Sequence, residues 1–278
     1  MSGALISPTD PIAVLGILKD AKAPKNLEIK IVGESLFNDG VGVVVFLVLF
    51  SIAQKGIGEV EADEVGLLFA EEVFGGMALG LGLGWIGLQI MKTIDHYETE
   101  VMITLALVMG IYGIAHLMHF SGPLAVVVAG IFIGNKSPEI AWSDTTQNYV
   151  DKFWELIDVF LNAILFVLIG LELLVVTING EYLLLGLIAI PMALLARYIA
   201  LAGPIQLFKK KLDFTPKTNL IMTWGGIRGG ISIALALSLQ PEMERDLFLT
   251  VTYVIVVFSI IAQGLTLGPL VKRVLRDN

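Results

Sequence analysis

The chain alternates long apolar stretches with short polar segments along its whole length. A helix needs about twenty apolar residues to cross the core of a bilayer, and shorter stretches can pair with one another inside a protein. Nine stretches meet these conditions, at roughly residues 3–18, 31–53, 66–91, 100–118, 121–134, 153–176, 182–208, 218–239 and 247–271. The pattern predicts an all-α fold, a polytopic membrane helix bundle in which residues 1–278 form one transmembrane domain.

Lys and Arg provide a separate test of this division, because the cytoplasmic loops of membrane proteins collect basic residues. If the first span ends in the cytoplasm, Lys55 and Arg245 are the basic residues of the outer segments, and Arg197 and Arg228 lie within spans. The other fourteen of the 18 fall on the cytoplasmic side: Lys19, Lys22, Lys25, Lys30, Lys92, Lys136, Lys152, Lys209, Lys210, Lys211, Lys217, Lys272, Arg273 and Arg276. The bias predicts a multi-pass protein of the inner or plasma membrane with a cytoplasmic C-terminus. It also places Met1 outside, so we expect that N-terminal spans of the fold are missing from this sequence.

Composition supports a membrane protein and excludes several other classes. Hydrophobic residues make up 56% of the chain and charged residues 16%, and the mean hydropathy is +0.82. The sequence has no cysteine and three histidines, which argues against a disulfide framework, a thiolate metal site or a zinc enzyme. A net charge of -8 leaves no basic face for nucleic acid. No cofactor is expected.

Four of the charged residues inside the predicted spans lie in segments with an unusual backbone or polar pattern: Asp10, Glu34, Asp39 and Arg228. A charge at the centre of a membrane helix costs about 2.5–3.5 kcal/mol, so four isolated charges would cost on the order of 10 kcal/mol. These side chains must therefore face one another or a wet cavity. A purely structural network of buried ion pairs is one explanation, and an ion site is the other.

The segment SPTDP, residues 7–11, predicts a break in the first span. Pro11 lacks an N–H and clashes with the preceding turn, and a residue before proline, here Asp10, is pushed out of helical geometry. A break would free carbonyls near Thr9, which together with the Asp10 carboxylate are the hard oxygen ligands that a small cation prefers. A simple proline kink is the alternative.

The segment GESLFNDG, residues 33–40, begins the second span with four polar side chains. Glu34 and Asn38 are four residues apart, as are Ser35 and Asp39, so on a helix they share one broad stripe. We expect this stripe to face the first span. A helix cap at the membrane surface is the alternative, but the preceding lysines place Asp39 more than two turns inside the membrane.

The segment TWGGIRGG, residues 223–230, places four glycines around Arg228. Glycines loosen a helix and let neighbouring backbones approach closely. The buried arginine needs a carboxylate partner, and Glu34 is the candidate.

Two other patterns allow weaker predictions. Glu172 can pair with Arg197 on the following span, although an Arg197 that reaches the membrane surface fits equally well. The glycines of the GxGxG pattern at 80–84 lie inside a span, so they indicate close helix packing and not a nucleotide-binding loop.

These segments together resemble the monovalent cation/proton antiporters, in particular bacterial sodium/proton antiporters related to the animal sodium/proton exchangers. The resemblance covers essentially the whole chain and rests on motifs in a specific order and spacing. They are TDP at 9–11, ESLFND at 34–39, SGPLAVVVAGIFIGN at 121–135, FVLIGLEL at 166–173, WGGIRGGISIALALSL at 224–239 and the closing FSIIAQGLTLGPLV. The resemblance implies two inverted repeats of about six helices, crossed unwound helices and a homodimer. It also implies that about four N-terminal helices of the family fold are absent.

The resemblance further implies a secondary transporter, not an enzyme, that exchanges Na+, or alternatively Li+ or K+, for H+. It makes Asp39 the carboxylate that binds the cation and carries the proton, with Asp10, Ser35 and the Thr9 backbone as co-ligands. Asn38 stands where electrogenic relatives have a second Asp, which implies electroneutral exchange. Glu34 and Arg228 match an ion pair that braces the core.

Two other functions stay open on the sequence. A cation channel would use similar acids without coupling to protons. An inactive fragment, or one half of a transporter, would need a partner to supply the missing helices.

Overall fold

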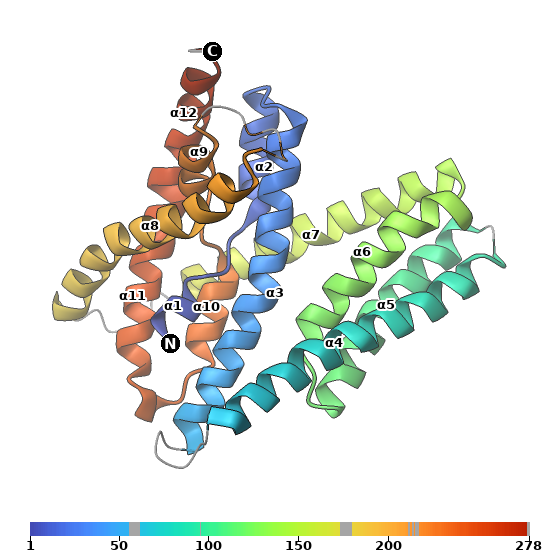
Figure 1. The fold of residues 1–278 in the computed structure, drawn as a ribbon, viewed down its shortest axis with the longest axis horizontal. Coiled ribbons are helices and arrows are strands. Elements are labelled where there is room, and N and C mark those ends of the chain that lie inside the picture. Colours follow the sequence, from blue (N-terminus) through green and yellow to red (C-terminus); the bar gives the residue numbers. More distant parts are fainter. Residues whose placement is uncertain are drawn as a thin grey trace. The chain divides into compact units, whose positions relative to one another are not determined.

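The computed structural model describes residues 1–55, 62–94, 96–172, 180–210, 212, 214 and 217–276, and in these residues the regular structure is helical throughout (Figure 1). The helices are α1 (Ser2–Leu5), α2 (Pro11–Asp20), α3 (Lys25–Lys55), α4 (Ala62–Met91), α5 (Tyr97–Leu117), α6 (Gly122–Ile140), α7 (Asp144–Glu172), α8 (Gly180–Phe208), α9 (Thr218–Trp224), α10 (Gly230–Leu237), η1 (Pro241–Met243), α11 (Arg245–Phe258), η2 (Ser259–Gln263) and α12 (Gly264–Arg276). The predicted helical membrane fold is confirmed.

Within the described residues, six continuous segments are long and apolar enough to cross a membrane: Lys25–Gln54, Gly66–Met91, Tyr97–Leu117, Asp144–Leu171, Gly180–Phe208 and Arg245–Arg276. The other three predicted spans correspond to α6 and to two pairs of short helices, α1 with α2 and α9 with α10. Each pair is interrupted in the middle, so neither member alone is long enough to cross. The sequence therefore located the apolar stretches. The six are three fewer than predicted, because two stretches are broken and the 19-residue α6 ends in the polar segment NKSPEI.

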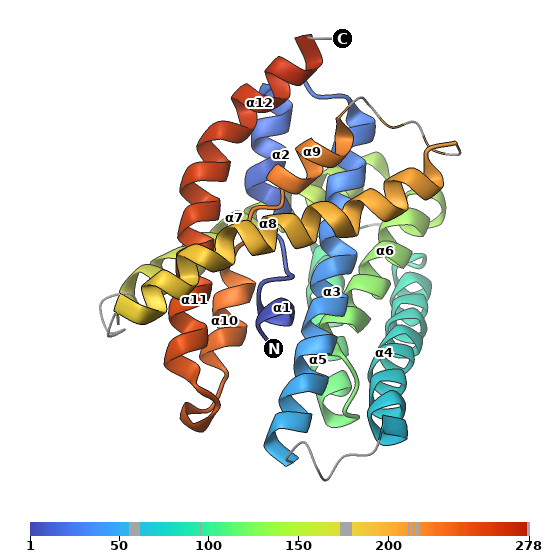
Figure 2. The ribbon, with the colours of Figure 1, turned by 60° about the vertical axis from the view of Figure 1, so that its left-hand side comes forward.

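The described chain divides into two compact units. The first unit consists of Met1–Phe46 and Leu168–Asn278, and it contains both broken helix pairs. Its apolar core joins the two ends of the chain, because α12 packs on α2 and α9. Figure 2 shows α2, α9 and α12 gathered at one end of this unit. The core residues are Val14, Leu18, Leu27, Ile31, Ile221, Met222, Ile227, Leu267, Val271 and their neighbours.

The second unit, Leu47–Val167, holds α4, α5 and α6 as unbroken helices. Here α4 and α6 pack so closely that a Cβ on Gly80 would lie 2.2 Å from the carbonyl oxygen of Ala125. A Cβ on Gly84 would lie 3.3 Å from Cα of Ala129, whereas one on Gly82 would meet nothing within 4 Å. Gly80 and Gly84 are four residues apart and share the packed face. The predicted packing role of this glycine pattern therefore holds for two of its three glycines.

Candidate functional site

The two interruptions of the first unit meet each other. The backbone N–H of Asp10, at the end of the α1–α2 break, donates to the carbonyl oxygen of Ile227 in the α9–α10 break at 2.7 Å. A Cβ on Gly229 would lie 2.9 Å from Cβ of Asp10, so the glycine permits this approach. The chain leaves the helical path before Pro11, which begins α2, as its missing N–H favours. The crossed, interrupted helices thus bring two segments far apart in sequence to one place.

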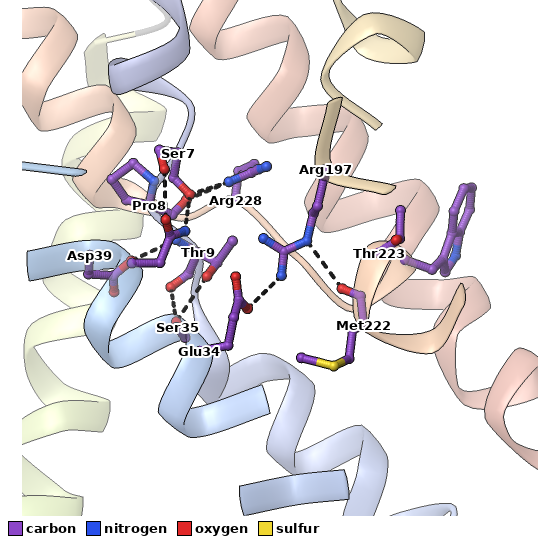
Figure 3. A network of polar contacts seen from close by, with 12 residues as sticks. Ser7, Pro8, Thr9, Glu34, Ser35, Asp39, Arg197, Met222, Thr223 and Arg228 are labelled. Atoms are coloured by element: carbon purple, nitrogen blue, oxygen red, sulfur yellow. Dashed lines mark hydrogen bonds and ion pairs between the residues drawn. The ribbon is translucent and has the colours of Figure 1, made fainter. Parts of the chain in front are cut away.

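Asp39 lies on α3 beside the α1–α2 break. The backbone N–H of Thr9 donates to its Oδ1 at 2.8 Å (Figure 3). This N–H is available because the break removes it from any helical ladder. The structure therefore places Asp39 against the unwound segment, and α3 runs as a helix through the whole GESLFNDG segment.

Ser35 joins the same segment one turn before Asp39. Its hydroxyl donates to the carbonyl oxygen of Thr9 at 2.5 Å and accepts from the hydroxyl of Thr9 at 3.0 Å. Ser35 is 1% exposed and Thr9 is 4% exposed. Two hydroxyls and one peptide carbonyl are thus gathered beside the carboxylate.

Asn38 makes a reciprocal contact with Ser7, a residue to which the sequence analysis assigned no role. The Ser7 hydroxyl donates to Asn38 Oδ1 at 2.8 Å, and Asn38 Nδ2 donates to the Ser7 carbonyl oxygen at 2.6 Å. A neutral amide is suited to this contact, because it offers a donor and an acceptor together. Asn38 holds the break against α3. Ser7 stands in the SPTDP segment, so the sequence contained the residue that pairs with Asn38.

Arg228 occupies the crossing but does not have the predicted partner. Its Nη1 donates to the carbonyl oxygens of Ser7 and Pro8, the latter at 3.3 Å (Figure 3). Arg228 is 8% exposed. The prediction of a Glu34–Arg228 ion pair is wrong, because the carbonyls freed by the α1–α2 break lie closer to this guanidinium and take its hydrogen bonds.

Glu34 pairs instead with Arg197 of α8, whose Nη2 lies 2.7 Å from Glu34 Oε2. Arg197 also donates through Nε to the carbonyl oxygen of Met222 at 3.2 Å, near the end of α9. A Cβ on Gly226 would lie 2.1 Å from Arg197 Nε, so a glycine is needed there. The expectation that Arg197 reaches the membrane surface is wrong, since it is 8% exposed. The side chain of Glu172, its other predicted partner, lies outside the described residues.

The groups around Asp39 offer oxygen atoms as possible ligands. Among the described residues, no group of three or more His, Asp or Glu side chains could hold a metal ion. The donors at the crossing are carboxylates, hydroxyls and a peptide carbonyl. Such hard oxygen ligands fit an alkali cation that must also leave.

Comparison with known proteins gives consistent results. A family model described as "Sodium/hydrogen exchanger, transmembrane" matches residues 1–273. The Na(+)/H(+) antiporter NhaP of Pseudomonas aeruginosa is 50% identical over 280 residues, which is 98% of this chain and 65% of that protein. The Na(+)/H(+) antiporter NhaH of Halobacillus dabanensis is 37% identical over 278 residues, 97% of this chain and 67% of that protein.

Among solved structures, the sodium proton antiporter MjNhaP1 of Methanocaldococcus jannaschii has a similar fold. The TM-score is 0.74 at 21% identity, over 99% of this chain and 70% of that one. The chain thus spans about two thirds of the length of NhaP and NhaH. The resemblance inferred from the motifs is confirmed. This chain belongs to the transmembrane sodium/hydrogen exchanger family.

Proposed function

We propose that this protein exchanges a monovalent cation for a proton across the membrane, with Asp39 as the group that binds both. The observation that carries the proposal is the contact of Asp39 Oδ1 with the freed N–H of Thr9 at 2.8 Å. It puts a carboxylate at an interrupted helix inside a long apolar span. Na+ is the cation that the names of the relatives indicate, and Li+ or K+ are alternatives.

Competition at one carboxylate provides the coupling. Asp39 can hold a proton or a cation but not both, and either loaded form carries the same net charge. The empty form carries one more negative charge. Moving that charge through an apolar barrier costs about 2–3 kcal/mol, which slows the empty return on the order of a hundredfold. Exchange is therefore faster than leak.

Thr9, Ser35 and Asp10 are the proposed co-ligands of the cation. The Thr9 carbonyl and the two hydroxyls already lie together beside α3. Hydroxyl and carbonyl oxygens can replace part of the hydration shell of an alkali cation without holding it too tightly to be released. Asp10 lies next to Thr9, at the point where the two breaks touch.

Electroneutral exchange, one cation for one proton, fits the residue before Asp39. Asn38 is neutral and has both ends of its amide engaged by Ser7. A second acid at this position would add another charge to be carried or neutralised. The ion pair of Glu34 with Arg197 and the hydrogen bonds of Arg228 then brace the core.

We also propose a cytoplasmic C-terminus and a homodimer. The first rests on the bias of Lys and Arg toward one set of loops. The second rests on the family resemblance alone. Both concern the setting of the site and leave its chemistry unchanged.

Flux in proteoliposomes tests the proposal. Purified protein is reconstituted under a pH gradient, and proton release on addition of Na+, Li+ or K+ is followed with a pH-sensitive dye, for wild type and Asp39→Asn. We expect cation-driven proton flux in wild type and none in Asp39→Asn, with both variants inserted equally. Proton-coupled flux that survives Asp39→Asn would contradict the assignment. Cation flux that ignores the proton gradient would indicate a channel, and no flux in wild type would indicate a chain that needs a partner.

A further inference from the structure

A π-helical turn faces the α9–α10 break. It is η2, residues Ser259–Gln263, and it joins α11 to α12. Such turns are rare and occur frequently at functional sites. Ser259 is 0% exposed and Gln263 is 2% exposed, and both are polar residues in an otherwise apolar segment. Their burial calls for an explanation other than solvation.

These two side chains satisfy peptide groups that the break leaves without helical partners. Gln263 Nε2 donates to the carbonyl oxygen of Trp224, the last residue of α9, at 2.9 Å. The backbone N–H of Arg228 donates to Ser259 Oγ at 2.8 Å. Buried peptide groups without partners are costly inside a membrane, so both contacts support the open backbone.

A hydrogen bond between Ser259 and Gln263 links these two contacts, with Ser259 as the donor. The Ser259 hydroxyl donates its single proton to Gln263 Oε1 at 2.5 Å, so its lone pairs are free to accept from Arg228. Gln263 must accept at one end of its amide and donate at the other. Only a side chain with both functions can complete the chain from Trp224 to Arg228.

The series of hydrogen bonds continues from Arg228 to Asp39, the proposed transport carboxylate. The bond from the Arg228 N–H to Ser259 fixes the backbone position of Arg228 and therefore its Cα. The guanidinium of Arg228 contacts the carbonyl oxygens of Ser7 and Pro8. The next residue, Thr9, donates its N–H to Asp39. A shift in the break is therefore passed to the oxygens around Asp39.

We propose that Gln263 and Ser259 are positioning residues for the cation site, acting through Arg228 on residues 7–9. The proposal rests on the proposed function for its transport readout. Neither residue touches Asp39 in the contacts described, so their effect is on the placement of the cation ligands. Small misplacements of ligating groups weaken binding strongly.

The test compares four variants with wild type. Gln263→Met keeps length and removes both amide functions, Ser259→Ala removes one oxygen, and the double variant removes both. Thr266→Val is the matched control, because Thr266 also ties α12 to α9, by accepting from the indole N–H of Trp224 at 2.8 Å. Its own hydroxyl donates to the carbonyl oxygens of Ala262 and Gln263, one turn before it, and not to residues 225–229. Two quantities are measured: the apparent KM for Na+ in proteoliposomes, and the melting temperature in detergent with and without Na+.

We expect each single variant to raise the apparent KM for Na+ about tenfold, the factor that corresponds to about 1.4 kcal/mol and hence to one buried hydrogen bond. The stabilisation by Na+ should shrink in parallel. The apparent KM for Na+ of the double variant should not exceed that of the more affected single variant, because the two residues belong to one series of hydrogen bonds. Thr266→Val should keep the wild-type KM.

Three results would overturn the proposal. They are a wild-type KM in Ser259→Ala, a KM in the double variant equal to the product of the single effects, and a Thr266→Val effect as large as that of Gln263→Met. If Gln263→Met does not fold, Ser259→Ala, the smallest truncation, decides. If the wild type shows no exchange, the proposed function fails, but the melting temperatures still test whether Gln263 and Ser259 act together. Additive losses of stability from Gln263→Met and Ser259→Ala would refute the linked hydrogen bonds. Non-additive losses would support them.

Discussion

In the unit of residues 1–46 and 168–278, two helix pairs are interrupted and polar side chains gather at the interruptions. In the unit of residues 47–167, α4, α5 and α6 run unbroken, and α4 meets α6 where Gly80 and Gly84 lie against Ala125 and Ala129. Both units are strongly apolar. The difference shows that buried polar groups accompany an open backbone, because each freed peptide group needs a partner inside a membrane.

A buried acid of the second unit also lies where peptide N–H groups lack helical partners. Glu100 is 0% exposed, and it lies in the first turn of α5. The first turn of any helix has free N–H groups, and the helix dipole favours a negative charge there. Free peptide groups thus occur at a helix end as well as at a break in mid-span.

The largest expected effect concerns the ion pair of the first unit. Glu34→Gln would leave the buried guanidinium of Arg197, whose side chain is 7% exposed, without its counter-charge. We expect a loss of about 3 kcal/mol in the free energy of unfolding, the low end for a buried pair because the Glu34 side chain is 24% exposed. Thermal unfolding in detergent measures it.

A surface pair of the second unit provides the control for Glu34→Gln. Lys136 and Glu139 are 3.5 Å apart, with side chains 54% and 65% exposed. Glu139→Gln should change the free energy of unfolding by at most about 0.5 kcal/mol. Equal effects of the two substitutions would contradict a special role for buried charge in the first unit, and partial rescue by exchanging Glu34 with Arg197 would support it.

The next effect concerns glycine packing in the second unit. Gly80→Ala would place a Cβ 2.2 Å from a backbone oxygen of α6, which cannot move aside as a side chain could. We expect a loss of about 2 kcal/mol from overpacking. Gly82→Ala is the matched control on the same helix, since nothing lies within 4 Å of its Cβ. It should stabilise the helix by up to about 1 kcal/mol. A similar change in both would show that α4 and α6 do not pack as described.

A glycine of the first unit should affect transport more than stability. Gly229→Ala would push its Cβ against Cβ of Asp10 at 2.9 Å, moving a proposed cation ligand. We expect the apparent KM for Na+ to rise about tenfold, equivalent to about 1.4 kcal/mol, with a smaller change in melting temperature. Gly130→Ala in α6, with open space around its Cβ, should leave the KM unchanged and, like Gly82→Ala, should not lower the melting temperature. An unaltered KM in Gly229→Ala would remove Asp10 from the site.

Local chemistry explains what the sequence could predict. The α1–α2 break follows from Pro11, whose effect on the preceding turn needs no tertiary information. The glycines at 225, 226, 229 and 230 predicted a loosened helix, and the structure has a full break there between α9 and α10. The stripe of Ser35, Asn38 and Asp39 follows from helical spacing, and the structure places all three against residues 7–9.

Partner choice could not be predicted, because it depends on how distant segments pack. Two arginines lie within spans, and the sequence does not say which reaches Glu34, 163 positions before Arg197. The α1–α2 break decided the partners, because its freed carbonyl oxygens accept the hydrogen bonds of Arg228. A comparison of charged residues alone does not include these carbonyls. The π-helical turn at Ser259–Gln263 was likewise unpredicted, since it depends on contacts with that same break.

The smallest effect concerns a polar contact of the second unit. Trp154 of α7 donates its indole N–H to Thr104 Oγ1 of α5 at 3.1 Å. Trp154→Phe should cost about 1 kcal/mol, because Thr104 keeps its own bond to the carbonyl oxygen of Val101. Thr104→Val completes a double-mutant cycle, with an expected coupling of about 0.5–1 kcal/mol. Exchange activity should persist in all three variants, since this bond supports no open backbone. A loss of exchange with folding intact would show that the second unit also carries part of the transport machinery, and the contrast between the units would fail.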